Sequence, residues 1–70
     1  MTHRDINGAE LHVGDLVRYG NREGTILILE DWDKLGGPSS YYPREGVYVS
    51  GIGTWGDNRA VPANRVEKIG

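Results

Sequence analysis

The stretch that decides the fold is LHVGDLVRYGNREGTILILE, residues 11–30. Its first half carries alternating apolar residues, and residues 20–24 form a polar turn with a glycine at each end. Its second half contains four consecutive aliphatic residues, 26–29, a pattern typical of a strand that is buried on both faces. Two strands joined by a turn with conformationally free glycines predict the beginning of a small curled β-barrel.

Further short strands are expected in the second half of the chain, at residues 46–50, 59–61 and 66–69. Pro62 ends the second of these because proline has no N–H to donate to a ladder, and residues 62–65 are expected to form one helical turn. Residues 31–45 contain two glycines and two prolines and predict a long connection without a helix. The sequence therefore predicts an all-β protein, a small five-stranded barrel with one short terminal 3-10 turn.

The length and composition indicate one small domain. The chain has 70 residues and no cysteine, so neither a disulfide nor a cysteine-ligated metal can stabilise it. Residues 1–10 are expected to form a tail, frayed over residues 1–5, and a turn at Asn7 and Gly8, while residues 11–70 form the barrel. No apolar run approaches the roughly 20 residues of a membrane span, and no secretory signal is expected. We therefore expect a cytoplasmic protein.

The core is expected to consist of the residues that alternate inward along each strand. These residues are Val13, Val17, Ile26, Ile28, Val47, Val49, Val61 and Ile69. Strict alternation then places Leu27 and Leu29 on the outer face, where two leucines form an apolar patch. A second copy of the chain that covers this patch gives the homo-oligomer that we expect through Leu27 and Leu29, and the long connection 31–45 is the alternative cover.

The aromatic residues predict a binding surface. All six are Tyr or Trp, residue types that bury a ring and keep a polar group for recognition. With the scattered arginines they give these candidate residues: Trp32, Tyr41, Tyr42, Tyr48, Trp55, Arg18, Arg44 and Arg59. Such a surface suits a proline-rich peptide, a methylated cation or a base held by stacking. The alternative interpretation is that Tyr19, Tyr48 and Trp55 complete a small core that lacks phenylalanine.

No catalytic residue, metal site or cofactor is expected. His3 and His12 lack further ligands at metal-binding spacing and are expected to be solvated. The acidic cluster Glu30, Asp31 and Asp33 is too short for a calcium loop, and is expected to keep the end of its strand soluble. The sequence shows neither a nucleophilic triad nor a phosphate-binding loop.

A resemblance covers most of residues 11–69. The segments VGDLVR at 13–18, GTI at 24–26, VYV at 47–49, VP at 61–62 and VEKI at 66–69 resemble SH3-like barrels of the KOW and Tudor kind. The chain is also similar to small SH3-like proteins of bacteriophages, plasmids and bacterial gene cassettes. The resemblance implies that loops and the face of the third strand form a binding groove, but this fold serves unrelated roles.

A second resemblance concerns an enzyme family. Gly14, Asp15, Val17 and Arg18 are similar to the opening of type II dihydrofolate reductases, and the ending after Pro62 matches loosely. The substrate-binding motif of that family, Val-Gln-Ile-Tyr, precedes its proline, whereas this chain has NRAV at residues 58–61. The glutamine and the tyrosine of the motif are both missing, and the shared residues are those that a barrel needs.

The charge of the chain ranks the candidate functions. Ten acidic and eight basic residues give a net charge of −2. This charge disfavours broad nucleic-acid binding, which depends on clustered Lys and Arg that neutralise phosphates. We therefore expect a non-catalytic binding module with a protein partner, and a phage or mobile-element accessory protein fits the size and the pattern. The alternatives are a KOW-like nucleic-acid-binding protein and an oligomeric enzyme whose site forms between subunits.

Overall fold

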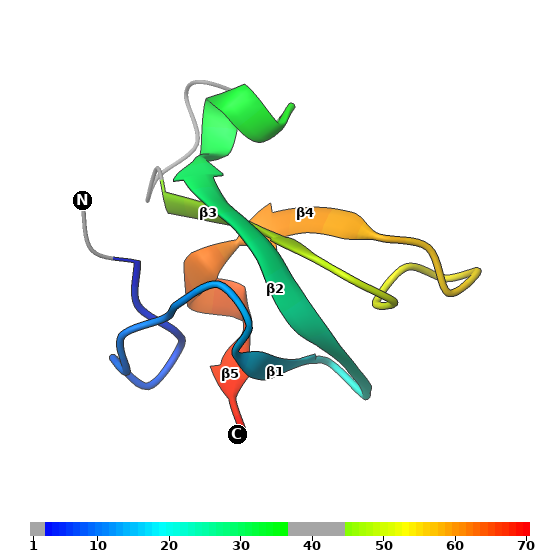
Figure 1. Cartoon of the computed structure of the whole chain (residues 1–70), viewed down its shortest axis with the longest axis horizontal. Coiled ribbons are helices and arrows are strands. Elements are labelled where there is room, and N and C mark those ends of the chain that lie inside the picture. The colour runs from blue at the N-terminus through cyan, green and yellow to red at the C-terminus, as the bar shows by residue number, and fades with distance from the viewer. Residues whose placement is uncertain (1–2, 37–44) are drawn as a thin grey trace.

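The computed structural model describes residues 3–36 and 45–70 and shows five antiparallel strands in one sheet (Figure 1). The strands are β1 (Leu16–Tyr19), β2 (Arg22–Asp31), β3 (Glu45–Val49), β4 (Arg59–Pro62) and β5 (Glu67–Lys68). Their order in the sheet is β4-β3-β2-β1-β5, so the long strand β2 lies at the centre. The prediction of an all-β, five-stranded protein is confirmed.

Two short 3-10 turns connect the strands. The turn η2 (Ala63–Arg65) follows β4 directly and confirms the helical turn expected there. The turn η1 (Trp32–Leu35) begins where β2 ends, inside the connection for which no helical structure was expected, and Gly36 ends it with a φ of 97°. Within residues 3–36 and 45–70, no helix is long and apolar enough to cross a membrane.

Strands β1 and β2 form a tight hairpin. Tyr19 pairs with Arg22 and Val17 pairs with Gly24, and Gly20 closes the turn with a φ of 63°. Gly24 must be a glycine because a Cβ atom at this position would collide with the carbonyl oxygen of Ser50. This close approach fixes the end of β3 against the beginning of β2.

A β-bulge at Leu27 decides which residues of β2 face the core. Ile26 pairs with Val49 and Ile28 pairs with Tyr48, so Leu27 is an extra residue in its strand. After the bulge the alternation restarts: Leu27 and Ile28 are 41% and 45% exposed, while Leu29 packs against the core. The predictions for Ile28 as a core residue and for Leu29 as an outer residue are therefore wrong, because both assumed strict alternation.

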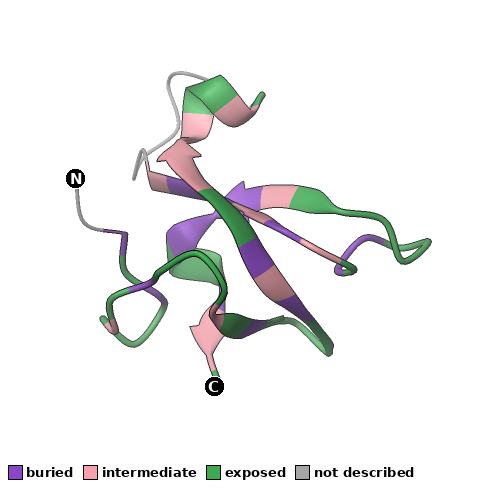
Figure 2. Cartoon of the chain, viewed as in Figure 1, coloured by how far each residue is buried: buried purple, intermediate pink, exposed green. Residues whose placement is uncertain are grey.

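Apolar residues from both the strands and the connections form the core. Figure 2 shows the buried residues distributed along the strands and on the turn that follows β4. The predicted core residues Val17, Ile26, Val47, Val49 and Val61 are buried, as expected. Four further residues of the described part of the chain belong to the core: Leu11, Ile52, Ala63 and Val66.

Two other predicted core residues are exposed. Val13 lies in the turn at Gly14, whose φ is 96°, and not in a strand. Ile69 lies three residues after the buried Val66, and an odd separation along an extended chain places it on the opposite face. Its backbone N–H still donates to the carbonyl oxygen of Leu16, at 3.0 Å.

Residues 3–11 form a compact segment attached to the sheet. The expected turn at Asn7 and Gly8 is confirmed, with a φ of 85° at Gly8 and a hydrogen bond from the Leu11 N–H to the His3 carbonyl oxygen. His3 is only 7% exposed, and its Nε2 donates to the carbonyl oxygen of Glu30 at 3.0 Å. The predictions of a frayed tail at residues 3–5 and of a solvated His3 are therefore wrong, because long-range hydrogen bonds hold the segment.

The carboxylate of Asp5 organises this segment. Asp5 is 5% exposed, and its oxygens accept hydrogen bonds from the backbone N–H groups of Asn7, Ala9 and Lys68 at 2.7–2.9 Å. Burial by itself raises the pKa of Asp5, but these N–H groups and that of Gly8 outweigh it and lower the pKa below its ordinary value. The contact with Lys68 ties the N-terminal segment to strand β5.

Candidate binding groove

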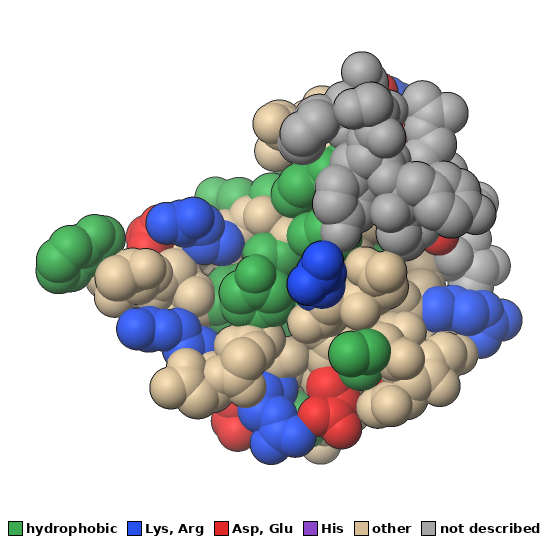
Figure 3. All heavy atoms as spheres, turned by 180° about the vertical axis from the view of Figure 1, so that it is seen from behind, with side chains coloured by type: hydrophobic (Ala, Val, Ile, Leu, Met, Phe, Trp, Pro, Cys, Tyr) green, Lys and Arg blue, Asp and Glu red, His purple; other side chains and the backbone are tan. Residues whose placement is uncertain are grey.

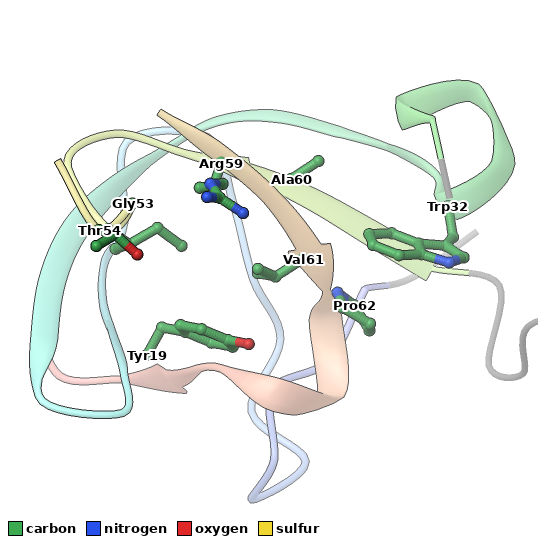
Figure 4. Close-up of a pocket in the computed structure, with 9 residues that line it drawn as sticks. Tyr19, Trp32, Gly53, Thr54, Arg59, Ala60, Val61 and Pro62 are labelled. Atoms are coloured by element: carbon green, nitrogen blue, oxygen red, sulfur yellow. The ribbon is translucent and has the colours of Figure 1, made fainter. Parts of the chain in front are cut away.

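A groove of about 240 Å³ opens between the end of β1 and strand β4. Figure 4 shows Val61 and Pro62 between the ring of Tyr19 and the indole of Trp32, with Arg59 close to Gly53 and Thr54. Ile52 and Ala60 complete the wall. The groove therefore has an apolar centre, aromatic groups at its sides and one charged residue among those that the structure describes.

The strand registers explain why three of these side chains, those of Tyr19, Arg59 and Val61, share one side of the sheet, whereas Ala60 and Pro62 alternate with them along β4. Val47 and Val49 are buried, and they pair with Val61 and Arg59, so the latter two lie on the same face. Tyr19 alternates with Arg18 and lies on the same face as the buried Val17. The inner face of the sheet thus continues past the core into the groove.

Trp32 reaches the groove because η1 packs closely on β3. A Cβ atom at Gly46 would lie 3.0 Å from the Cα atom of Trp32 and 3.0 Å from the side chain of Leu35. Glycine at this position lets the turn approach the strand without strain. The indole can then lie beside Pro62, which pairs with Gly46 in the neighbouring strand.

The loop between β3 and β4, residues 50–58, is held by Asp57. Its backbone carbonyl accepts the N–H of Gly53 at 2.8 Å, and its carboxylate accepts the N–H of Trp55 at 3.3 Å and the Nε–H of Arg59 at 3.4 Å. The backbone N–H of Asp57 itself, the N–H of Trp55 and the Arg59 guanidinium hold the pKa of Asp57 below its ordinary value. A side chain at Gly53 would collide with this carboxylate.

Two guanidinium groups lie at the Gly53 end of the groove. Arg59 lines the groove, and Arg22 donates from Nη1 to the carbonyl oxygen of Gly53 at 3.1 Å. Figure 3 shows the molecule from behind, with apolar side chains near the centre of this face and Lys and Arg side chains around them. An apolar floor with cationic groups at its rim suits a ligand that has both an apolar part and a polar part.

The structure brings together two of the eight candidate residues, Trp32 and Arg59. Tyr48 lies on the other face of the sheet, where it pairs with Ile28 and Ala60. Arg18 also lies on that face and forms an ion pair with Glu67. Trp55 is 90% exposed at the tip of its loop and does not line the groove. Tyr41, Tyr42 and Arg44 lie outside the described residues.

The alternative interpretation, in which aromatic residues complete the core, is wrong for Trp55 because this side chain is exposed. Tyr48 is half-buried on the outer face, and Tyr19 forms a wall of the groove. Sequence reasoning missed Tyr19, Ile52 and Pro62 as groove residues. The alternation of Tyr19 with Arg18 was the available signal, since it places Tyr19 on the inner face at the end of a short strand.

The ionisable groups elsewhere in the described residues are used structurally or are solvated. No group of three or more His, Asp or Glu that could hold a metal ion occurs in residues 3–36 and 45–70. The prediction of a solvated His12 is confirmed, and this side chain lies 3.5 Å from a Glu10 oxygen at the surface. The acidic cluster at the end of β2 is neutralised in part by Lys34, whose Nζ lies 3.7 Å from Glu30 and 3.9 Å from Asp31.

Comparisons with protein-family models, with curated proteins and with solved structures found no match for this chain. The geometry of the groove is therefore the basis of the functional proposal.

Proposed function

We propose that this protein is a small non-catalytic binding module whose groove between Tyr19 and Trp32 holds an extended, proline-rich segment of a protein partner. The observation that carries the proposal is the apolar floor of Val61 and Pro62 between two aromatic side chains. Aromatic-lined grooves of this kind bind polyproline II segments, because such segments are already extended and lose little entropy on binding.

The groove favours a peptide over a small substrate. Among the residues that the structure describes, the lining holds one charged side chain, that of Arg59, and no His, Asp or Glu that could act as a general acid or base. Its volume of about 240 Å³ accommodates a few side chains of an extended chain. A second candidate function, nucleic-acid binding of the KOW kind, is supported by Arg22 and Arg59 beside Tyr19, where a base can stack and a phosphate can pair.

We further propose that the chain is an SH3-like barrel and a cytoplasmic accessory protein of a phage or mobile element. Five antiparallel strands and a 3-10 turn between β4 and β5 support an SH3-like barrel. The small size and the resemblance of residues 11–69 support an accessory protein of a phage or mobile element, and the absence of cysteine supports a cytoplasmic location.

The experiment that tests the proposal is an NMR titration with a blocked nonapeptide, Gln-Gln-Pro-Pro-Leu-Pro-Pro-Gln-Gln. We expect saturable shifts of the Trp32 indole N–H and of the Thr54 amide, because both residues line the groove. The variant Trp32→Ala should lose this binding. The matched control Tyr48→Ala removes an aromatic ring from the opposite face and should retain it. Shifts that persist in Trp32→Ala, or no shifts at millimolar peptide, would show that the groove is not a peptide site.

A further inference from the structure

The two ends of the groove carry opposite charge. At one end, Arg59 uses its Nε–H for Asp57, and its two terminal nitrogens have no partner among the described residues. Arg22 uses one nitrogen for the Gly53 carbonyl oxygen and likewise has unused donors in this part of the chain. This end can therefore accept a carboxylate without breaking an existing hydrogen bond.

The Trp32 end is acidic. Trp32 lies between Asp31 and Asp33 in the chain, and Glu30 precedes them. Lys34 is the single cation of residues 30–34 and pairs with Glu30 and Asp31. Asp33 is exposed and has no ion pair within residues 3–36 and 45–70. A basic group is therefore favoured at this end and an acidic group is disfavoured.

We propose that the groove selects a bipolar peptide: an apolar, proline-rich centre with an acidic side chain at the Arg59 end and a basic side chain at the Trp32 end. This inference rests on the proposed function and adds the charge pattern of the ligand. Figure 4 shows Arg59 on the side of Gly53 and Thr54 and Trp32 on the other side, with Val61 and Pro62 between them, so both charges of one peptide can be satisfied together.

The opposite charges at the two ends of the groove favour a peptide ligand over a nucleic acid. A single-stranded nucleic acid carries a phosphate at every nucleotide, so its chain brings negative charge to the acidic end as well as to the Arg59 end. A uniformly basic segment meets Arg22 and Arg59 in the same unfavourable way. Only a ligand that changes sign along its length matches both ends.

The effect of each charge is expected to be moderate because both ends are exposed to solvent. An ion pair of this kind should lower the dissociation constant of the peptide about two- to fivefold at each end. The improvement should shrink at about 0.5 M salt, where the Debye length falls to roughly 4 Å.

Four blocked nonapeptides test the inference by calorimetry. All share the centre Pro-Pro-Leu-Pro-Pro, which is flanked by two residues on each side. The bipolar peptide has two glutamates at one end and two lysines at the other. The three remaining peptides have glutamates at both ends, lysines at both ends, or glutamines at both ends. We expect the bipolar peptide to bind most tightly. Arg59→Gln should remove the advantage of the glutamate end, and Asp33→Asn the advantage of the lysine end. Arg18→Gln, on the opposite face of the sheet, is the matched control and should change neither.

The outcomes separate this inference from the function on which it rests. If the glutamine-ended peptide binds as tightly as the bipolar one, the charge pattern is wrong and the peptide-binding groove stands. If no peptide binds, both are wrong. If an oligothymidylate of eight nucleotides binds more tightly than the bipolar peptide, and Arg59→Gln weakens it, the groove is a nucleic-acid site and the inference is overturned.

Discussion

Two short segments of this protein, residues 3–11 and residues 50–58, are each organised by one aspartate, but the two carboxylates differ in burial. Asp5 is 5% exposed and accepts three backbone N–H groups, one of them from Lys68 across the sheet. Asp57 is at the surface, where it accepts the N–H of Trp55 and pairs with Arg59.

The difference in burial indicates that one aspartate contributes mainly to the stability of the fold and the other mainly to the geometry of the groove. Hydrogen bonds to a buried carboxylate are costly to remove, because the donors that remain cannot reach water. Hydrogen bonds to an exposed carboxylate are replaced by water, so their loss changes local geometry more than stability. We therefore expect Asp5 to stabilise the whole domain, and Asp57 to shape the loop beside the groove.

The largest effect on stability is expected from the substitution Asp5→Ala. This substitution removes the acceptor of three partly buried hydrogen bonds, those from the N–H groups of Asn7, Ala9 and Lys68. A donor left unpaired where water cannot reach it costs about 1–3 kcal/mol. The free energy of unfolding should fall by about 3 kcal/mol or more, measured by urea denaturation. Asp57→Ala is the matched control and should leave the urea midpoint nearly unchanged. Equal losses for both variants would contradict the comparison.

The second effect is a dependence of stability on pH that comes from Asp5. The pKa of Asp5 in the folded protein lies below its ordinary value of 3.8, so the unfolded state takes up a proton first as the pH falls. The contribution of Asp5 is therefore complete above about pH 5, and it is lost as the pH falls below about 4 toward the lowered pKa. Urea denaturation at pH 7 and pH 3 should show this loss in the wild type.

The variants Asp5→Asn and Asp57→Asn sharpen the pH prediction. Asp5→Asn should be less stable at neutral pH and should lose less on acidification, because position 5 no longer titrates. Asp57→Asn should keep most of the wild-type slope, since an exposed carboxylate is screened by solvent. An unchanged slope in Asp5→Asn would show that another group controls the acid sensitivity.

The third effect concerns the loop that Asp57 holds. Gly53→Ala places a Cβ atom against the Asp57 carboxylate, so that side chain must turn away and release its hydrogen bonds to Trp55 and Arg59. Because these hydrogen bonds are exposed, we expect a cost of no more than about 1 kcal/mol, together with weaker binding of the glutamine-ended nonapeptide, because Gly53 and Thr54 line the groove. Thr54→Ala changes a neighbouring exposed residue without a collision, and its stability should stay within about 0.5 kcal/mol of the wild type. Full binding by Gly53→Ala would mean that the loop does not shape the site.

The sequence predicts the strands well because strand formation here follows local patterns. Strand β1 lies in the first half of residues 11–30, as expected, and the expected turns at Gly8 and Gly20 contain glycines that adopt a positive φ. The bulge at Leu27, in contrast, is not marked by a glycine or by any other pattern in the sequence. Four consecutive aliphatic residues fit either register of β2, and the pairing with β3 decides between them.

The site was harder to predict than the strands because it depends on contacts between distant segments. Of the predicted binding residues, Trp32 and Arg59 line the groove, whereas Tyr48 faces the other side of the sheet. Tyr19 entered only the alternative interpretation, as a residue that completes the core. The N-terminal segment was mistaken for a frayed tail for the same reason. Its turn is visible in the sequence, whereas the bonds of Asp5 to Lys68 and of His3 to Glu30 are not.

The smallest effect on stability is expected at the bulge in β2. There, exposed side chains can be compared with a side chain that packs against the core. We propose that the outer face carries a self-association surface, now formed by Leu27 and Ile28 in place of Leu27 and Leu29. Because both side chains are more than 40% exposed, replacing both by Lys should change the free energy of unfolding by only about 0.5 kcal/mol. Sedimentation at tens of micromolar, roughly where a weak interface forms, should show a dimer for the wild type and a monomer for the variant. Leu29→Lys is the matched control and should lower the free energy of unfolding by more, about 1–2 kcal/mol, because Leu29 is partly buried against the core. A monomeric wild type would overturn the proposed interface, and a Leu29→Lys variant as stable as the wild type would overturn the bulge on which the assignment of the two faces depends.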